Sequence, residues 1–135
     1  MHFPWDPALE TGNADMDAQH KRLFVLASQL QAAAIERDDA ELVTDAVYRL
    51  TDYVLEHFTD EESLMHACAY PGLNAHCSLH ERLTAETMRF TAQLCGGSVA
   101  ATALAPFVME WLRGHIRDED SRFVAYWRTY GGAEA

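Results

Sequence analysis

The sequence predicts an all-α protein, an up-down-up-down four-helix bundle preceded by an N-terminal arm. Apolar residues recur at spacings of three, four and seven along four separate segments, as they do on the buried face of a helix. Each segment is about 20 residues long, and short runs rich in Gly, Pro or Asp separate the segments. Since the chain has no strand pattern and only 135 residues, a single domain is expected over residues 1–135.

An arm and a first helix are expected at the beginning of the chain. Residues 1–16 form the arm, because they lack sustained periodicity and contain three residues that interrupt helices: Pro4, Pro7 and Gly12. Asp17 is an acceptable N-cap for the first helix. This helix is expected to end near Arg37, since Asp38-Asp39 then supply a turn and the next cap. Its apolar side carries Leu23, Phe24, Leu26, Leu30 and Ala34.

The second and third helices are separated by Pro71-Gly72, a pair that breaks helices. The apolar side of the second helix carries Leu42, Val43, Ala46, Leu50, Val54, Phe58 and Met65. The third helix is expected from about Leu73 to Leu94, and Gly96-Gly97-Ser98 ends it. Its apolar residues are Leu79, Leu83, Met88 and Phe90.

The fourth helix is expected to begin near Val99 and to continue towards Trp127. Pro106 falls within its first two turns, where the missing N–H of proline costs least. The apolar residues of this helix are Leu104, Phe107, Val108, Trp111, Leu112 and Ile116.

The charge of the chain excludes two classes of partner. A net charge of −11 argues against nucleic acid and against an anionic membrane surface, because both bind clustered Lys and Arg.

Charged residues interrupt every apolar run before it could cross a bilayer, so no transmembrane segment is expected. The N-terminus lacks a basic start and an apolar signal core, and a cytoplasmic location is therefore expected.

The three cysteines, Cys68, Cys77 and Cys95, are expected to be free thiols. An odd number without C-x-x-C spacing is typical neither of a disulfide framework nor of a thiolate metal site.

Beyond the bundle core, the sequence shows no further long apolar face. A monomer is the expected state.

Seven side chains with nitrogen or carboxylate oxygen donors form a spaced set of candidate metal ligands: His20, His57, Glu61, His76, His80, His115 and Asp120. One divalent ion rarely uses so many side chains, so the set indicates two metal ions. Imidazole and carboxylate without thiolate favour iron, zinc or manganese, and seven ligands exceed what tetrahedral zinc needs.

Helical spacing decides which of these side chains share a face. His76 and His80 are four residues apart and point the same way from adjacent turns. The separation of His115 and Asp120 fits less well, because residues five apart lie about 140° apart around an ideal helix. Asp118 and Glu119 fit a straight helix better. Either the helix loosens after His115, or one of these two is the ligand.

A count of coordination positions suggests an asymmetric pair of ions. Two octahedral ions offer about 12 coordination positions. All but about one of these positions are filled by five imidazoles, two bridging carboxylates and one shared solvent oxygen. The vacancy falls on the ion with fewer histidines. Six apolar residues are expected near the ligands, with no Lys, Tyr or further carboxylate placed to shuttle protons: Leu23, Phe58, Met65, Trp111, Leu112 and Ile116. They form a pocket that excludes water from a bound ligand, or they are simply bundle core.

Together these motifs resemble the hemerythrin family, specifically its single-domain bacterial members. The matching segments are Asp17–Phe24 (DAQHKRLF), His57–Met65 (HFTDEESLM), Tyr70-Pro71, His76-x3-His80 and Trp111–Asp120 (WLRGHIRDED). They are spread over most of the chain. The resemblance implies a four-helix bundle of the kind that also includes myohemerythrin.

The resemblance further implies a centre of two iron ions (Fe2+/Fe3+) with a bridging oxo or hydroxo group. Three histidines would hold one iron (His76, His80 and His115), and His20 and His57 would hold the other. Glu61 and Asp120 would bridge the two, so the resemblance selects Asp120 over its neighbours. Dioxygen would bind end-on at the iron with two histidines, be reduced to a hydroperoxide there, and leave reversibly.

Three functions are compatible with such a centre. The first is non-enzymatic dioxygen binding for oxygen storage, delivery or sensing. The alternative is a diiron redox enzyme acting on peroxide, nitric oxide or ferrous iron, although the Glu-x-x-His pairs of ferritin-like oxidases are absent from the sequence. The third is a docking protein that hands oxygen to an oxygen-consuming enzyme.

Overall fold

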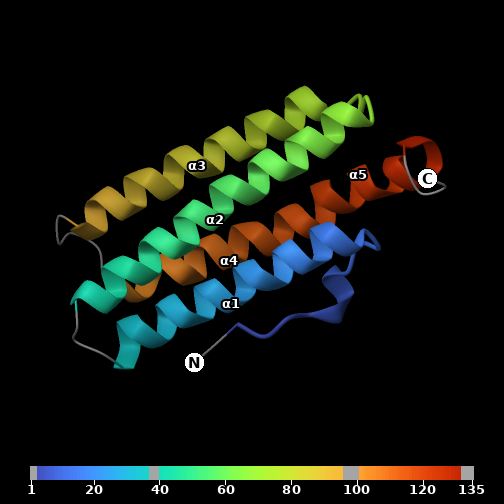
Figure 1. Ribbon diagram of the computed structural model, residues 1–135. Coiled ribbons are helices and arrows are strands. Elements are labelled where there is room, and N and C mark those ends of the chain that lie inside the picture. Colours follow the sequence, from blue (N-terminus) through green and yellow to red (C-terminus); the bar gives the residue numbers. More distant parts are fainter. Residues whose placement is uncertain (1–2, 37–39, 96–100, 132–135) are drawn as a thin grey trace.

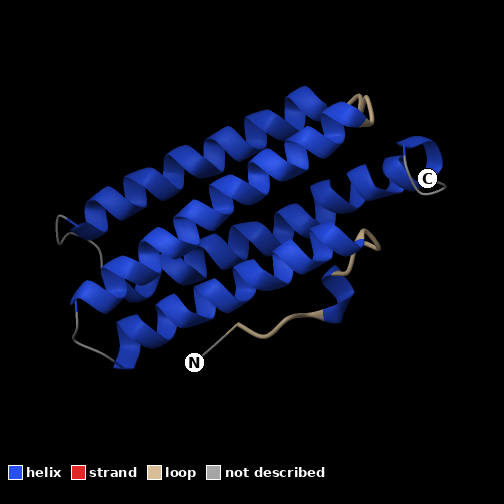
Figure 2. Ribbon diagram, viewed as in Figure 1, coloured by secondary structure: helices blue, strands red, loops and turns tan. Residues whose placement is uncertain are grey.

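Four helical segments run alternately up and down in the structure, a computed structural model that describes residues 3–36, 40–95 and 101–131 (Figure 1). They are α1 (Ala14–Glu36), α2 (Ala40–Ala67), α3 (Leu73–Cys95) and a fourth segment that begins with α4 (Leu104–His115). Helix α1 packs against α2, α2 against α3, α3 against α4, and α4 back against α1. The described residues contain helices and loops but no strand (Figure 2). The prediction of an all-α four-helix bundle is confirmed.

Helix α1 begins three residues before its predicted N-cap. Asn13 caps it instead, since its Oδ1 accepts a hydrogen bond from the backbone N–H of Met16 at 3.1 Å. Asp17 lies in the first turn of the helix and faces back to the arm. Its carboxylate accepts hydrogen bonds from the backbone N–H groups of Thr11 (2.9 Å) and Gly12 (3.1 Å). The prediction that Asp17 is the cap, with the arm extending to residue 16, is therefore wrong.

The N-terminal arm lies along the outside of α1 (Figure 1). It contains the short helix η1 (Pro7–Leu9), whose Leu9 is buried. The backbone N–H of Phe3 donates to Ser28 Oγ at 2.7 Å, and the ring of Trp5 meets that of Phe24 edge-on, with 5.1 Å between centroids. These contacts fix the arm against the helix that carries the first candidate ligand.

Of the three predicted connections between helices, only the one between α2 and α3 lies within the described residues. Helix α2 ends at Ala67, Ala69 has a left-handed backbone with φ of 54°, and α3 starts at Leu73. The predicted break at Pro71-Gly72 is confirmed. The turns predicted at 38–39 and 96–98, and the helix ends predicted near residues 37 and 99, lie outside the described residues.

The fourth segment is not one continuous α-helix. The short helix η2 (Ala101–Ala103) precedes α4, and Pro106 falls in the first turn of α4, as predicted. After α4 come a π-helical turn η3 (Ile116–Asp120), the short helix α5 (Ser121–Tyr126) and a second π-helical turn η4 (Trp127–Gly131).

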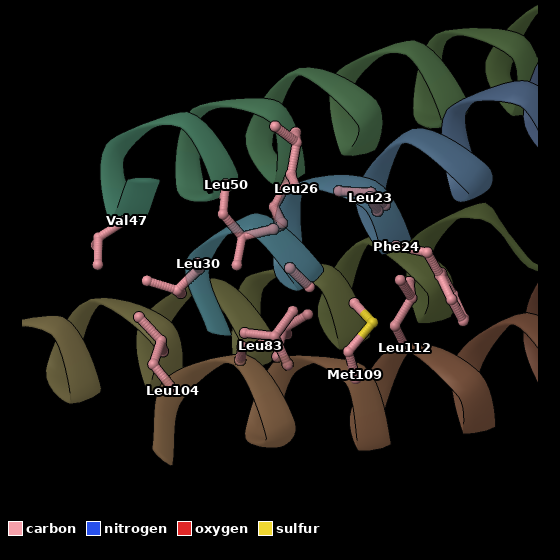
Figure 3. Close-up of a cluster of buried hydrophobic side chains, with 14 of the residues drawn as sticks. Leu23, Phe24, Leu26, Leu30, Val47, Leu50, Leu83, Leu104, Met109 and Leu112 are labelled. Carbon is pink, nitrogen blue, oxygen red and sulfur yellow. The ribbon is translucent and has the colours of Figure 1, made fainter. Parts of the chain in front are cut away.

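The core consists of two apolar clusters. The larger cluster fills one end of the bundle, with side chains from all four helical segments, including Leu23, Leu50, Leu83 and Leu112 (Figure 3). The smaller cluster contains Met16, Met65, Phe123 and Val124. Along each helical segment, the candidate ligands come after residues of one cluster and before residues of the other. On α1, for example, Met16 of the smaller cluster precedes His20, and Leu23 of the larger cluster follows it. The ligands therefore form a polar layer across an otherwise apolar interior.

Two residues predicted on apolar helix faces are exposed instead. Leu42 of α2 is 45% exposed and Met88 of α3 is 44% exposed. Of the cysteines, Cys68 and Cys77 are free and half-buried. None of the described helices combines the length and the apolarity that crossing a bilayer requires.

Candidate metal centre

All seven predicted ligands meet in the interior of the bundle, and none is more than 5% exposed. Every helical segment contributes at least one of them. Helix α1 carries His20, α2 carries His57 and Glu61, α3 carries His76 and His80, α4 carries His115, and η3 carries Asp120. So many polar side chains do not become buried together without strong mutual contacts or bound ions.

The donor atoms fall into two groups that share both carboxylates. The three-histidine half consists of His76, His80 and His115 with Glu61 and Asp120. The two-histidine half consists of His20 and His57 with the same two carboxylates. Within each group, all donor atoms lie within 4.8 Å of one another. This arrangement can hold two metal ions side by side with two carboxylates bridging them.

In the three-histidine half, the imidazole Nε2 atoms converge. His115 Nε2 lies 3.1 Å from His76 Nε2 and 3.2 Å from His80 Nε2. Glu61 Oε1 lies 2.7 Å from His76 Nε2, and Asp120 Oδ1 lies 3.1 Å from the same atom. Three nitrogens and two oxygens thus face one point, as the ligands of a single ion do.

In the two-histidine half, the rings come from α1 and α2 and meet edge-on, with centroids 4.8 Å apart. His20 Nε2 lies 3.1 Å from Asp120 Oδ2, and His57 Nε2 lies 3.2 Å from Glu61 Oε2. Each carboxylate therefore turns one oxygen to each half. This half has one imidazole fewer than the other.

The π-helical turn explains how Asp120 reaches the layer. In η3 the backbone bonds from residue i to i+5, and the Ser121 N–H donates to the carbonyl of Ile116. The wider winding brings residues five apart onto one side, so Asp120 faces inward with His115. Asp118 points out and pairs with Arg117 at 3.1 Å. Of the alternatives that the spacing left open, the helix does loosen after His115.

Two further side chains orient the ligand rings, and the sequence analysis did not identify either. Glu62 Oε2 accepts a hydrogen bond from His80 Nδ1 at 2.7 Å, and Gln19 Oε1 accepts one from His57 Nδ1 at 2.7 Å. A proton held on Nδ1 leaves the Nε2 lone pair free for a metal. The sequence analysis expected no further carboxylate placed to shuttle protons, and Glu62 is a carboxylate in direct contact with a ligand ring.

Both residues are adjacent in sequence to a candidate ligand. Gln19 directly precedes the ligand His20 on α1, but its side chain orients His57 on α2. Glu62 directly follows the ligand Glu61 on α2, but its side chain orients His80 on α3. A polar residue adjacent in sequence to one ligand can therefore support a ligand on the next helix.

Burial and ion pairing act in opposite directions on the pKa values of the layer. Burial alone would lower the pKa of His20, but the carboxylates of Asp120 and Glu61 more than offset it and raise this pKa to about 9. The same balance raises the pKa of His76 to about 9. Burial and Glu61 would raise the pKa of Asp120, but three neighbouring histidines lower it to about 2. Without metal, the raised pKa values of His20 and His76 favour protons that offset the charge of the buried carboxylates, and divalent ions can replace those protons.

Several buried atoms of the layer make no hydrogen bond even so, although most of them lie 3.1–3.2 Å from an oppositely charged partner. They are Asp120 Oδ1 and Oδ2, Glu61 Oε2, His20 Nδ1 and Nε2, and His57 Nε2. Buried polar atoms without partners are rare and destabilise a protein unless something else satisfies them. All but one of these atoms are donor atoms of the two groups described above, so the residues fit two metal ions better than a purely ion-paired core.

Aromatic rings cover the three-histidine half. Phe58 stacks on His80 with centroids 3.8 Å apart, and Trp111 stacks on His115 with centroids 4.3 Å apart. Leu23, Leu112 and Ile116 belong to the same large cluster as Phe58. Met65, the remaining residue of the predicted pocket, lies in the smaller cluster. The six residues are therefore distributed over both sides of the ligand layer.

Comparisons with known proteins agree with one another. The family model of the hemerythrin HHE cation-binding domain matches residues 11–127. The chain is 30% identical over 123 residues to a bacteriohemerythrin of Pseudomonas aeruginosa, covering 91% of this chain and 80% of that protein. A myohemerythrin of Riftia pachyptila is 27% identical over 121 residues, covering 90% of each. A crystal structure of wild-type hemerythrin superposes with a TM-score of 0.83 at 26% identity, covering 90% of this chain and 95% of that one.

Proposed function

Because this chain belongs to the hemerythrin family, we propose that it binds dioxygen reversibly at a non-haem diiron centre, for oxygen storage, delivery or sensing. The observation that supports the proposal is the pair of ligand groups that share two carboxylates but differ by one histidine. With two ions bound, such a pair would leave an open position on one ion only. Other members of the family carry names of oxygen-binding proteins, among them the myohemerythrin of Riftia pachyptila.

In this proposal each ligand has one role. His76, His80 and His115 would hold the first iron, and His20 and His57 would hold the second. Glu61 and Asp120 would bridge the two irons together with an oxo or hydroxo group. The short contacts of both carboxylates with histidines of both halves support this assignment.

The chain's own residues determine what happens at the open position. When bound, two ferrous ions would supply the two electrons that hold dioxygen. Gln19 and Glu62 keep their histidine rings in the orientation that ligation needs. The buried apolar side chains of Leu23, Phe58 and Leu112 exclude water from the layer. A dry site lacks protons that would convert bound dioxygen into released peroxide.

The apolar pocket for dioxygen beside the ligand layer is itself a proposal. We assign it to Leu23, Phe58, Met65, Trp111, Leu112 and Ile116, which lie in or against the two apolar clusters next to the ligand layer. A monomer in the cytoplasm remains our expectation, and an oxygen-consuming enzyme is the partner that a delivery role would require. Light scattering of the purified protein tests the expected monomer.

Cycles of oxygenation test the function. The protein is reduced without oxygen, exposed to air, and returned to argon, while its visible spectrum is followed over several cycles. An oxygen-dependent band that disappears under argon and returns in air supports a carrier. Conversion to a ferric form on first exposure, with peroxide released, favours the competing hypothesis of a diiron redox enzyme.

A further inference from the structure

The two halves of the ligand layer use acceptors of different charge to hold a ligand ring. In the three-histidine half, His80 Nδ1 donates to a carboxylate oxygen of Glu62 at 2.7 Å. In the two-histidine half, His57 Nδ1 donates to the amide oxygen of Gln19 at 2.7 Å. Because the two distances are equal, the contacts differ chiefly in the negative charge that the carboxylate of Glu62 carries and the amide of Gln19 does not.

A neighbouring carboxylate fixes which end of the Gln19 amide faces the ligand ring. Gln19 Nε2 donates to Asp60 Oδ2 at 3.2 Å, and an ionised carboxylate can only accept. The amide oxygen is therefore the atom turned to His57, whose Nδ1 must donate to it. In this half an amide separates the carboxylate charge from the ligand ring, whereas in the three-histidine half the carboxylate bonds to the ring directly.

An anionic acceptor changes a metal ligand more than a neutral acceptor does. A carboxylate that binds the Nδ1 proton raises the basicity of the Nε2 atom on the same ring. A more basic Nε2, together with the negative charge nearby, stabilises a trivalent ion more than a divalent one. The side chain of Glu62 is only 32% exposed, so water screens its charge incompletely. An iron ion bound to His80 should therefore lose an electron more readily than one whose ligand rings are bonded to neutral acceptors.

We propose that Glu62 and Gln19 set the two iron positions at different reduction potentials, with the three-histidine half at the lower potential. On mild oxidation the three-histidine half would give up the first electron, and the two-histidine half would stay ferrous. The neutral amide of Gln19 thus keeps the half with the open position in its reduced state. The inference rests on the proposed diiron centre but not on dioxygen binding.

Stepwise oxidation of the iron-loaded protein tests the proposal. Fully reduced protein is titrated without oxygen with ferricyanide, each ion of which takes one electron and becomes ferrocyanide, and the potential of each step is recorded. Glu62→Gln keeps an acceptor oxygen but loses the charge, so the first oxidation is expected to become roughly tenfold less favourable, or about 59 mV for one electron. Gln19→Glu brings a charge against His57, so the second oxidation is expected to become more favourable by a similar factor.

Two controls separate the charge beside the ring from net charge and from ring orientation. Glu119→Gln removes one charge from a side chain of nearly the same exposure, 31%, but Glu119 bonds to Arg122 rather than to a ligand ring. This variant is expected to shift either step by less than about twofold. Nitrogen nuclear magnetic resonance of the zinc-loaded protein follows the Nδ1 proton of His80, which is expected in the wild type and in Glu62→Gln alike.

The results that overturn the proposal are distinct from those that overturn the centre. Equal shifts of the first step in Glu62→Gln and Glu119→Gln contradict the proposal, and so does an unchanged first step in Glu62→Gln. Loss of the Nδ1 proton of His80 in Glu62→Gln assigns any shift to orientation and also contradicts it. If the wild type binds fewer than two irons, the proposed diiron centre is wrong, and the two potentials fall with it.

Discussion

The two halves of the ligand layer are built on different pairs of helices and to different degrees of completeness. The three-histidine half draws its rings from α3 and α4, and stacked aromatic rings cover two of its three imidazoles. The two-histidine half draws its rings from α1 and α2, where the two imidazoles meet edge-on. The two halves therefore differ in the number of imidazoles and in their aromatic cover.

The two halves show how a symmetric fold can contain an asymmetric site. Both halves use the same two carboxylates, and each half has one ring oriented by a polar side chain from a neighbouring helix. The asymmetry comes from a single additional imidazole on the α3–α4 side. Because the two halves share both carboxylates, neither half is independent of the other, and this coupling is what the following substitutions test.

The largest effect is expected from removing a shared carboxylate. Asp120→Ala takes one ligand from both ions at once and leaves buried histidines without their partner, so iron content is expected to fall from two to below about one per chain. Asp118→Ala is the matched control, since this exposed neighbour pairs only with Arg117. Iron analysis after desalting measures both variants. Loss of iron from Asp118→Ala with retention in Asp120→Ala would reverse the assignment.

Removing one histidine from each half should cause a smaller loss of iron that differs between the two halves. His57→Ala leaves the two-histidine half with one imidazole, whereas His80→Ala leaves the three-histidine half with two. We expect about one iron per chain and no oxygen-dependent band for His57→Ala, and higher iron content for His80→Ala. Metal analysis and visible spectra of the two variants give the comparison. If His57→Ala keeps two irons, the ligand assignment of the open half is wrong.

The side chains that orient the rings should have a weaker effect on metal affinity. Glu62→Ala and Gln19→Ala each remove the acceptor of an Nδ1 proton, so iron affinity in the corresponding half is expected to fall roughly 10- to 100-fold. Glu62→Gln keeps an acceptor oxygen and should restore most of the loss. Competition with a chelator of known affinity measures all three variants. If Glu62→Gln binds iron as weakly as Glu62→Ala, the carboxylate acts through its charge rather than by orienting His80.

The smallest effect concerns the aromatic cover. Phe58→Leu removes the ring stacked on His80 and leaves a gap in the large cluster, which is expected to destabilise the metal-free protein by about 1 to 3 kcal/mol. Val25→Ala, at an exposed position of α1, serves as the control. Urea denaturation gives both free energies of unfolding. Equal values for the two variants would contradict a packing role for Phe58.

Periodicity was sufficient to predict the bundle, because the bundle follows from which residues share a helix face, whereas only the resemblance to the family selected Asp120. It could not predict the π-helical turn that brings Asp120 inward, since that winding depends on the contacts of the whole segment. Nor could it decide between Asn13 and Asp17 as the cap, because both residue types cap helices and the path of the arm determines which one does. Leu42 lies exposed although it fits the apolar stripe, since spacing does not reveal which edge of a stripe another helix covers.

The outer partners of the ligand rings show the same limit at the site. Gln19 and Glu62 look like ordinary surface residues in the sequence, and each has a role only because of a histidine on another helix. Such contacts depend on how far each helix is rotated in the bundle. A pattern within one segment carries no information about that rotation.

Oxygen stoichiometry tests the central claim most directly. The claim is that two irons share one open position, located on the two-histidine half. Anaerobically reduced protein of known iron content is titrated with dissolved oxygen, and the oxygen returned under argon is measured with an electrode. We expect one dioxygen to be taken up per two irons and the same amount to be released. One dioxygen per iron, or uptake without release, would contradict it.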